Sequence, residues 1–256
     1  MFIDTHCHID DEKFSDKDAV YTNLVAKNVI YAINMSCNNK SIDDSVYLAE
    51  KYERVYFGAG IHPSDIEELN DEIIDKIIGA TKHKKCVAIG EIGLDYHFEP
   101  FSREKQVDGF IKQLEIASSV SLPVSIHCRD ATGDMLNILK DNKSKIKNGA
   151  IMHCFSGSVE TARELIKMGV YISFGGTLTF KNAKNLKEVA KDIPNDFILT
   201  ETDSPYLSPE PYRGRINEPQ NVSLITEYLA FLRNTDVNNM ATTILNNTCR
   251  IMPKLK

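Results

Sequence analysis

Short apolar runs alternate with amphipathic helical patterns along most of the chain. Eight of these runs are rich in apolar and β-branched residues and show little alternation with polar ones, which is typical of parallel strands buried on both faces. The segments between them carry apolar residues at helical spacing. The eight predicted strands cover residues 2–5, 29–35, 55–60, 86–91, 123–128, 149–154, 170–175 and 197–202.

This alternation predicts an α/β protein built as a single (β/α)8 TIM barrel. An open doubly wound sheet is the alternative, but such a sheet more often carries a glycine-rich fingerprint after its first strand, and none occurs here. Two more helices are predicted after the eighth strand, over residues 221–232 and 240–251. Because no repeat or proline-rich linker marks a boundary, we expect one domain over residues 1–256.

Composition narrows the class of protein. No stretch is apolar enough to cross a membrane, and acidic residues interrupt any signal sequence at the start. The six cysteines form no C-x-x-C pair, so we expect a cytoplasmic protein without disulfides. The net charge of −6 argues against a general nucleic-acid binder with a basic face. We also expect a monomer with no obligate protein partner.

Histidines and carboxylates gather where the predicted strands end, which is the catalytic end of a barrel of this kind. Five of the seven histidines lie there, whereas chance placement would spread them over helices and loops. Histidines converging from several strands form a metal site. The residues at these strand ends are His6, His8, His62, Glu91, His127, Arg129, His153, Glu201 and Asp203.

Barrel closure suggests two cations. Strands one and eight become neighbours, so the ligands at their ends share one ion, and strands five and six hold the second. A carboxylate at the end of strand four has two oxygens and can bridge both ions. Zn²⁺, Mn²⁺, Co²⁺ and Mg²⁺ all remain open for this mixture of imidazole and carboxylate. The six proposed ligands are His6, His8, Glu91, His127, His153 and Asp203.

The ordered set of motifs resembles the TatD family of metal-dependent deoxyribonucleases, a branch of the amidohydrolase-like barrels. The resemblance runs from residue 2 to about residue 220. It implies a TIM barrel, two divalent cations and hydrolysis of phosphodiester bonds in DNA, often from a 3′ end. The motifs are His6-x-His8, Gly60-Ile61-His62-Pro63, Gly90-Glu91-Ile92-Gly93-Leu94-Asp95, His127-x-Arg129, His153-Cys154-Phe155-Ser156-Gly157 and Glu201-Thr202-Asp203-Ser204-Pro205.

Roles follow as hypotheses. A hydroxide that bridges the metals attacks phosphorus, with Glu91 as bridge and Asp203 as general base and then acid. Glu201 either orients a ligand histidine from outside the metal shell or is an ordinary inward salt-bridge partner. Asp4 and Asp95 are further candidates for such orienting contacts. Cys7, Cys128 and Cys154 are expected to face the helices and pack.

Anionic substrate oxygens need partners besides the metals. Arg129 and His62 are predicted to bind the phosphate or sugar of a DNA end or single strand. Arg213 and Arg215 are expected either to reach the same group or to lie in a solvated loop.

Two other functions compete with a nuclease. One is a small-molecule hydrolase of amides, esters or lactones on the same barrel, but many such relatives bridge their metals with a modified lysine rather than a residue like Glu91. The other is a non-catalytic metal-binding protein, which the complete set of six ligands disfavours.

Overall fold

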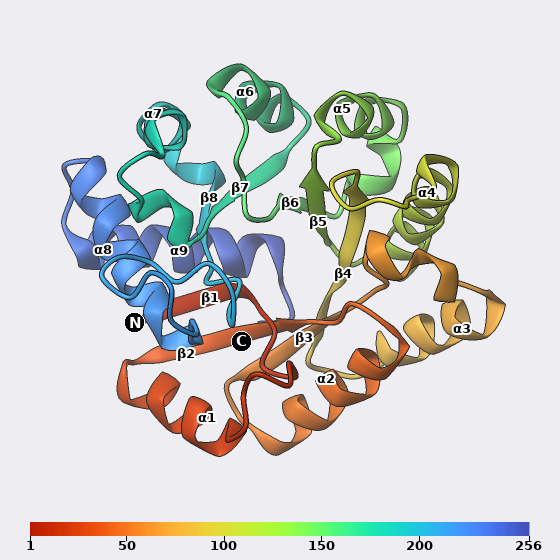
Figure 1. Ribbon diagram of the computed structural model, residues 1–256, viewed down its shortest axis with the longest axis horizontal. Helices are drawn as coiled ribbons and strands as arrows, with labels where there is room; N and C mark the ends of the chain where they lie inside the picture. The colour runs from red at the N-terminus through yellow and green to blue at the C-terminus, as the bar shows by residue number, and fades with distance from the viewer. Residues whose placement is uncertain (256) are drawn as a thin grey trace.

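The computed structural model describes residues 1–255 and contains eight parallel strands, each paired with its neighbour in sequence. Figure 1 shows the strands gathered at the centre with helices outside them. The predicted (β/α)8 barrel is therefore confirmed. The strands are β1 (Phe2–Cys7), β2 (Val29–Met35), β3 (Val55–Ala59), β4 (Cys86–Asp95), β5 (Val124–Arg129), β6 (Ala150–Met152), β7 (Val170–Phe174) and β8 (Ile198–Thr200).

Helices follow each strand, and one more closes the chain. The helix predicted from residue 240 begins three residues earlier, because the Asp236 side chain caps it by accepting from the amides of Asn238 and Asn239. The helices are α1 (Lys17–Ala26), α2 (Asn39–Lys51), α3 (Asp71–Ala80), α4 (Arg103–Val120), α5 (Thr132–Asp141), α6 (Val159–Lys167), α7 (Lys184–Asp192), α8 (Val222–Leu232) and α9 (Val237–Ile251).

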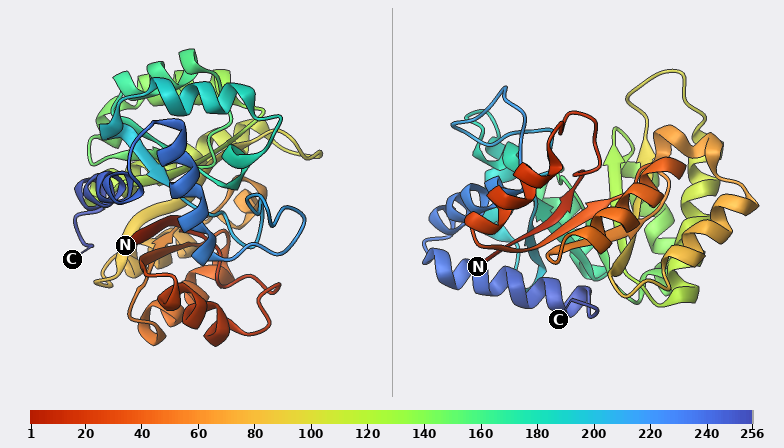
Figure 2. Two further views of the ribbon diagram at one scale, coloured as in Figure 1. Left: turned by 90° about the vertical axis from the view of Figure 1, so that its left-hand side faces the viewer. Right: turned by 90° about the horizontal axis from the view of Figure 1, so that it is seen from below.

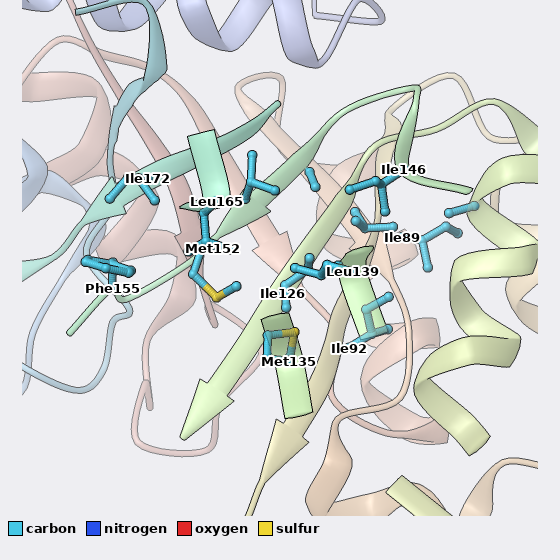
Figure 3. Packing of buried hydrophobic residues seen from close by; sticks show 14 of the residues in the cluster. Ile89, Ile92, Ile126, Met135, Leu139, Ile146, Met152, Phe155, Leu165 and Ile172 are labelled. Carbon is cyan, nitrogen blue, oxygen red and sulfur yellow. The ribbon is translucent and has the colours of Figure 1, made fainter. Parts of the chain in front are cut away.

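Most of the core lies between the strands and the surrounding helices. Ile126 and Met152, from β5 and β6, meet Met135, Leu139 and Leu165 from α5 and α6 (Figure 3). Strands covered in this way need apolar residues toward the helices as well as toward the barrel axis. This explains why the strand sequences lack a regular apolar and polar alternation.

Helix α9 lies across one end of the barrel, and the loops that follow β1, β4 and β8 project from the other (Figure 2, right). The Asn247 amide of α9 donates to the carbonyls of Asn195 and Ile198, which fixes the helix below the start of β8. The carboxyl ends of the strands are therefore the open end. Within residues 1–255, no helix has both the length and the apolar composition required to cross a bilayer.

The end of β1 is joined to the segment that follows β8. The Asp203 amide donates to the His6 carbonyl over 2.9 Å, and the His8 amide donates to the Ser204 carbonyl over 2.7 Å. Below them, the carboxylate of Asp4 accepts from the Thr202 amide over 2.8 Å. These bonds place the His6-x-His8 motif beside Asp203, as the predicted barrel closure requires.

Strand β4 is longer than expected. The sequence pattern placed Glu91 at the end of this strand. The strand in fact continues to Asp95, so Glu91 lies inside it. The pairing of β4 with β5 shifts in register around Glu91, whose amide donates to the Ser36 carbonyl over 2.8 Å. Further along, Gly93 has a φ of 145°, and a Cβ there would lie 2.0 Å from the His127 carbonyl oxygen. Only glycine lets the two strands approach this closely.

Candidate metal centre

A hollow of about 740 Å³ opens at the carboxyl ends of the strands. Imidazoles and carboxylates lie at its floor, and a mixture of aromatic, aliphatic and basic side chains lines its mouth. The hollow lies at the end of the barrel where a site of this fold is expected. His8, Glu91, His127, His153 and Asp203 are among the residues that line it.

Glu91 is at the centre of the cluster, and its two oxygens face different pairs of imidazoles. Oε2 lies 3.2 Å from Nε2 of His6 and 3.5 Å from Nε2 of His8. Oε1 lies 2.8 Å from Nε2 of His153 and 2.9 Å from Nδ1 of His127. In this arrangement each Glu91 oxygen could contribute to a separate cation site.

The first pair of imidazoles comes from β1 and the residue that follows it. Nε2 of His6 and Nε2 of His8 are 3.2 Å apart, and Oδ1 of Asp203 lies 3.5 Å from Nε2 of His8. Nδ1 of His8 lies 2.9 Å from the Met35 carbonyl oxygen, which can only accept a hydrogen bond. The proton of His8 is therefore on Nδ1, and the lone pair on Nε2 points into the site.

The second pair is oriented in the same way by a carboxylate. Nε2 of His127 lies 2.9 Å from Oδ2 of Asp95, so the lone pair on Nδ1 faces inward, 3.2 Å from Nε2 of His153. The outer nitrogen of His153, Nδ1, lies 3.5 Å from Oε1 of Glu201. The same Glu201 oxygen accepts the amide of Cys154. Asp95 and Glu201 thus contact ligand candidates from behind.

These donor groups fit divalent cations. Inward lone pairs of imidazoles face carboxylate oxygens at 2.8–3.5 Å, a contact between acceptors that a shared cation makes favourable. In a tetrahedral site with metal–nitrogen bonds of about 2.0–2.1 Å, ligand atoms lie about 3.4 Å apart, close to these spacings. Five overlapping sets of three donors in the described residues are close enough to hold an ion, and among them are His6 with His8 and Asp203, and Glu91 with His127 and His153.

Both carboxylates in the cluster are held in the ionised form. Burial raises the pKa of Glu91, but the imidazoles packed around it, His153 foremost, favour its ionised form and hold the pKa well below its usual range. Burial also raises the pKa of Asp203, and its bond to His8 and the charges of nearby imidazoles reverse the effect. Both groups can therefore bind cations at neutral pH.

His62 differs from the other imidazoles. Its Nδ1 accepts the Ser64 amide over 3.1 Å, so the proton lies on Nε2, which is 3.6 Å from Oε1 of Glu91. Burial lowers the pKa of His62 to about 4. It is therefore neutral at pH 7 and presents a hydrogen-bond donor to the hollow, as a substrate contact would.

The predicted arginines are divided between two places. Arg129 lines the mouth of the hollow, and its guanidinium lies 4.7 Å from the centre of the Phe98 ring. Arg213 is exposed and lies outside the hollow, with its guanidinium 4.2 Å from the centre of the Phe180 ring. Arg215 lies over Tyr212 in the same loop. The structure thus brings Arg129 to the cluster but leaves Arg213 and Arg215 apart from it.

The sequence pattern missed Cys37, which follows β2. Its Sγ lies 3.7 Å from Nδ1 of His8 and 3.8 Å from Oε2 of Glu91. Burial raises the pKa of the Cys37 thiol to about 12. Its position just after a strand end was the available signal. Cys7 packs as expected, and Cys128 packs against the core but also lines the hollow. Cys154, which lies beyond the end of β6 and has a φ of 43°, lines the hollow instead of facing the helices as predicted.

Known proteins resemble this chain over nearly its full length. The family model described as TatD related DNase matches residues 3–253. YabD, an uncharacterized metal-dependent hydrolase of Bacillus subtilis (strain 168), is 40% identical over 252 residues, or 98% of both chains. The crystal structure of YJJV, a TatD homolog from Escherichia coli K12, has a TM-score of 0.92 and 30% identity, with 98% of each chain covered. A beta-aspartyl dipeptidase of Fervidobacterium islandicum AW-1 shares only the fold, with 13% identity, a TM-score of 0.67 and coverage of 98% of this chain and 74% of that one.

Proposed function

Because the chain belongs to the family of TatD related DNases and is a metal-dependent hydrolase, we propose that it hydrolyses phosphodiester bonds of DNA from the 3′ end with two divalent cations. The observation that carries the proposal is Glu91, whose two oxygens face separate pairs of imidazoles. Many amide and lactone hydrolases on this fold use a modified lysine as the bridge, so a glutamate there favours the phosphodiesterase.

The residues divide the work of holding the cations. The inward nitrogens of His6 and His8 with the carboxylate of Asp203 would hold one cation, and His127 and His153 would hold the second. Glu91 would contribute one oxygen to each site. When bound, Zn²⁺, Mn²⁺ or Mg²⁺ would supply the Lewis acidity that makes water nucleophilic near neutral pH and offsets the charge of the phosphodiester.

Asp203 is proposed to move the proton. It is ionised at neutral pH, lines the hollow, and has a φ of 55°, in the left-handed region that aspartate adopts more readily than most residues. The backbone N–H of Asp203 donates a hydrogen bond to the His6 carbonyl, which fixes the residue in this position. A carboxylate so placed can accept the proton of the attacking water and return it to the leaving oxygen.

The phosphate itself is held by the wall of the hollow. Arg129 can present a planar pair of donors to the non-bridging oxygens, and Nε2–H of His62 can donate from the β3 side. Asp95 and Glu201 position His127 and His153 rather than contacting substrate. Substrate binding by Arg213 remains a prediction and requires the loop after β8 to reach past Phe180.

Four substrates test this proposal. Protein stripped with a chelator and reloaded separately with Zn²⁺, Mn²⁺ or Mg²⁺ is incubated with single-stranded DNA labelled at the 3′ or the 5′ end, with bis(p-nitrophenyl) phosphate and with p-nitrophenyl acetate. We expect metal-dependent cleavage of both phosphodiesters, and early release of the 3′ label. Hydrolysis of the acetate alone would contradict the proposal and favour a small-molecule esterase.

A further inference from the structure

Two exposed aromatic rings stand at the mouth of the hollow, each beside a cation. Phe98, in the loop between β4 and α4, is 64% exposed and lies against the Arg129 guanidinium. Tyr206, after β8, is 43% exposed, and Nζ of Lys13 lies 3.9 Å from the centre of its ring. Both rings line the hollow, and the loops that carry them project from the same end of the barrel (Figure 2).

The loop that carries Phe98 is anchored at both ends. Asp134 accepts from Tyr96 Oη over 2.8 Å at one end and from Nε of Arg103 over 2.6 Å at the other. The rings of Tyr96 and Phe101 stack, with centres 5.0 Å apart. The neighbouring aromatic residues are therefore used within the fold, whereas Phe98 is left open to solvent above Arg129.

The charges around Phe98 and around Tyr206 differ, and this difference indicates which side of the mouth binds the phosphate backbone of a polyanion. Beside His8, on the side of β1 and β2, a second hollow is lined by four carboxylates, Asp10, Asp11, Glu12 and Asp44, and by Lys40, which pairs with Glu12 and Asp44. Tyr206 belongs to this acidic side, because its hydroxyl donates to Asp11 over 2.7 Å. A chain of phosphates is repelled there and attracted on the side of Arg129.

We propose that Phe98 is a platform on which an unpaired base of the substrate stacks, while Arg129 beneath it binds the adjoining phosphate. An aromatic ring stacks on any base that is free of its neighbours, and a guanidinium at the ring strengthens attraction for the nucleotide as a whole. Phe98 is therefore a residue that selects nucleic-acid ends over other phosphodiesters. This assignment rests on the proposed function and deepens it.

The test removes the ring and the base separately. Phe98→Ala, Phe98→Tyr and, as a remote control, Phe231→Ala on α8 (72% exposed) are compared on an oligodeoxynucleotide. The same proteins are then assayed on three further oligonucleotides, each with a single abasic residue at a different one of the last three positions. We expect Phe98→Ala to raise KM for the intact strand about tenfold to a hundredfold, more than it lowers kcat, and Phe98→Tyr to restore it.

The effects on KM of Phe98→Ala and of removing the stacked base should not be additive. At one abasic position, the unaltered protein and Phe98→Ala should differ by less than about twofold in KM, because the stacking partner is already absent. An unchanged KM for Phe98→Ala, or the same penalty at every abasic position, would overturn the assignment while the proposed function stands. Failure of the unaltered protein to cleave any phosphodiester would instead overturn the proposed function, and this assignment with it.

Discussion

Replacing Glu91 by glutamine is expected to release most of the bound metal and to lower kcat/KM by more than about a hundredfold. The amide is neutral and offers one acceptor oxygen, whereas the carboxylate faces His6 and His8 with one oxygen and His127 and His153 with the other. Loss of a partner behind the metal ligands already costs about 10–100-fold. A group that touches both cation sites should cost more. Metal content and steady-state rates on bis(p-nitrophenyl) phosphate measure both effects.

Glu201→Gln is the matched control for this change. Glu201 is as buried as Glu91 and contacts the cluster through His153 and the Cys154 amide. We expect Glu201→Gln to keep its metal at saturating concentration and to lose at most about a hundredfold in rate. Two metal equivalents and unaltered turnover in Glu91→Gln would refute the bridging role.

Asp203→Asn is expected to lower kcat by about 10²–10⁴-fold, the contribution usual for general acid–base catalysis. Loss of the proton acceptor should be felt with every substrate. The loss should be larger for a dinucleotide than for bis(p-nitrophenyl) phosphate. Nitrophenolate can leave as an anion, whereas the oxygen of a sugar must be protonated as it leaves. Rates on the two substrates, at metal concentrations that saturate the variant, give the comparison.

The pH profile supplies a control for Asp203. Burial raises its pKa, but the contact with His8 and the charges of neighbouring imidazoles bring it below the ordinary value, so the carboxylate stays ionised as pH falls toward that value. Protonation of Asp203 should therefore not reduce activity between about pH 5 and pH 8.

In the substitution experiment, equal losses on the dinucleotide and on bis(p-nitrophenyl) phosphate, or complete loss of metal from Asp203→Asn, would show that Asp203 is a metal ligand only.

The sequence was informative where the position of a side chain can be deduced from the alternation of strands and helices. Once eight units are recognised, the carboxyl ends of the strands must meet at one end of the barrel, which places His6, His8, His127 and His153 together. The hydrogen bonds between the ends of β1 and the residues after β8 complete the first group. Strand order alone was sufficient to place these proposed ligands together, because each lies within a few residues of a buried strand.

The sequence was less informative where the backbone departs from regular pairing. Glu91 lies inside β4, at a register shift that no periodicity reveals. Cys37 and Phe98 lie in segments that follow β2 and β4, and their positions depend on side-chain contacts made by those segments. The loop after β8 directs Arg213 onto Phe180 and away from the cluster, whereas the sequence left Arg213 open between a phosphate contact and a solvated loop.

Anomalous diffraction from crystals grown with Zn²⁺ or Mn²⁺, recorded at the absorption edge of the metal, tests the central claim most directly. Two peaks are expected, one among His6, His8 and Asp203 and one between His127 and His153, with the Glu91 carboxylate between them. A single peak that leaves one oxygen of Glu91 without a metal, or peaks elsewhere on the protein, would contradict the two-cation account.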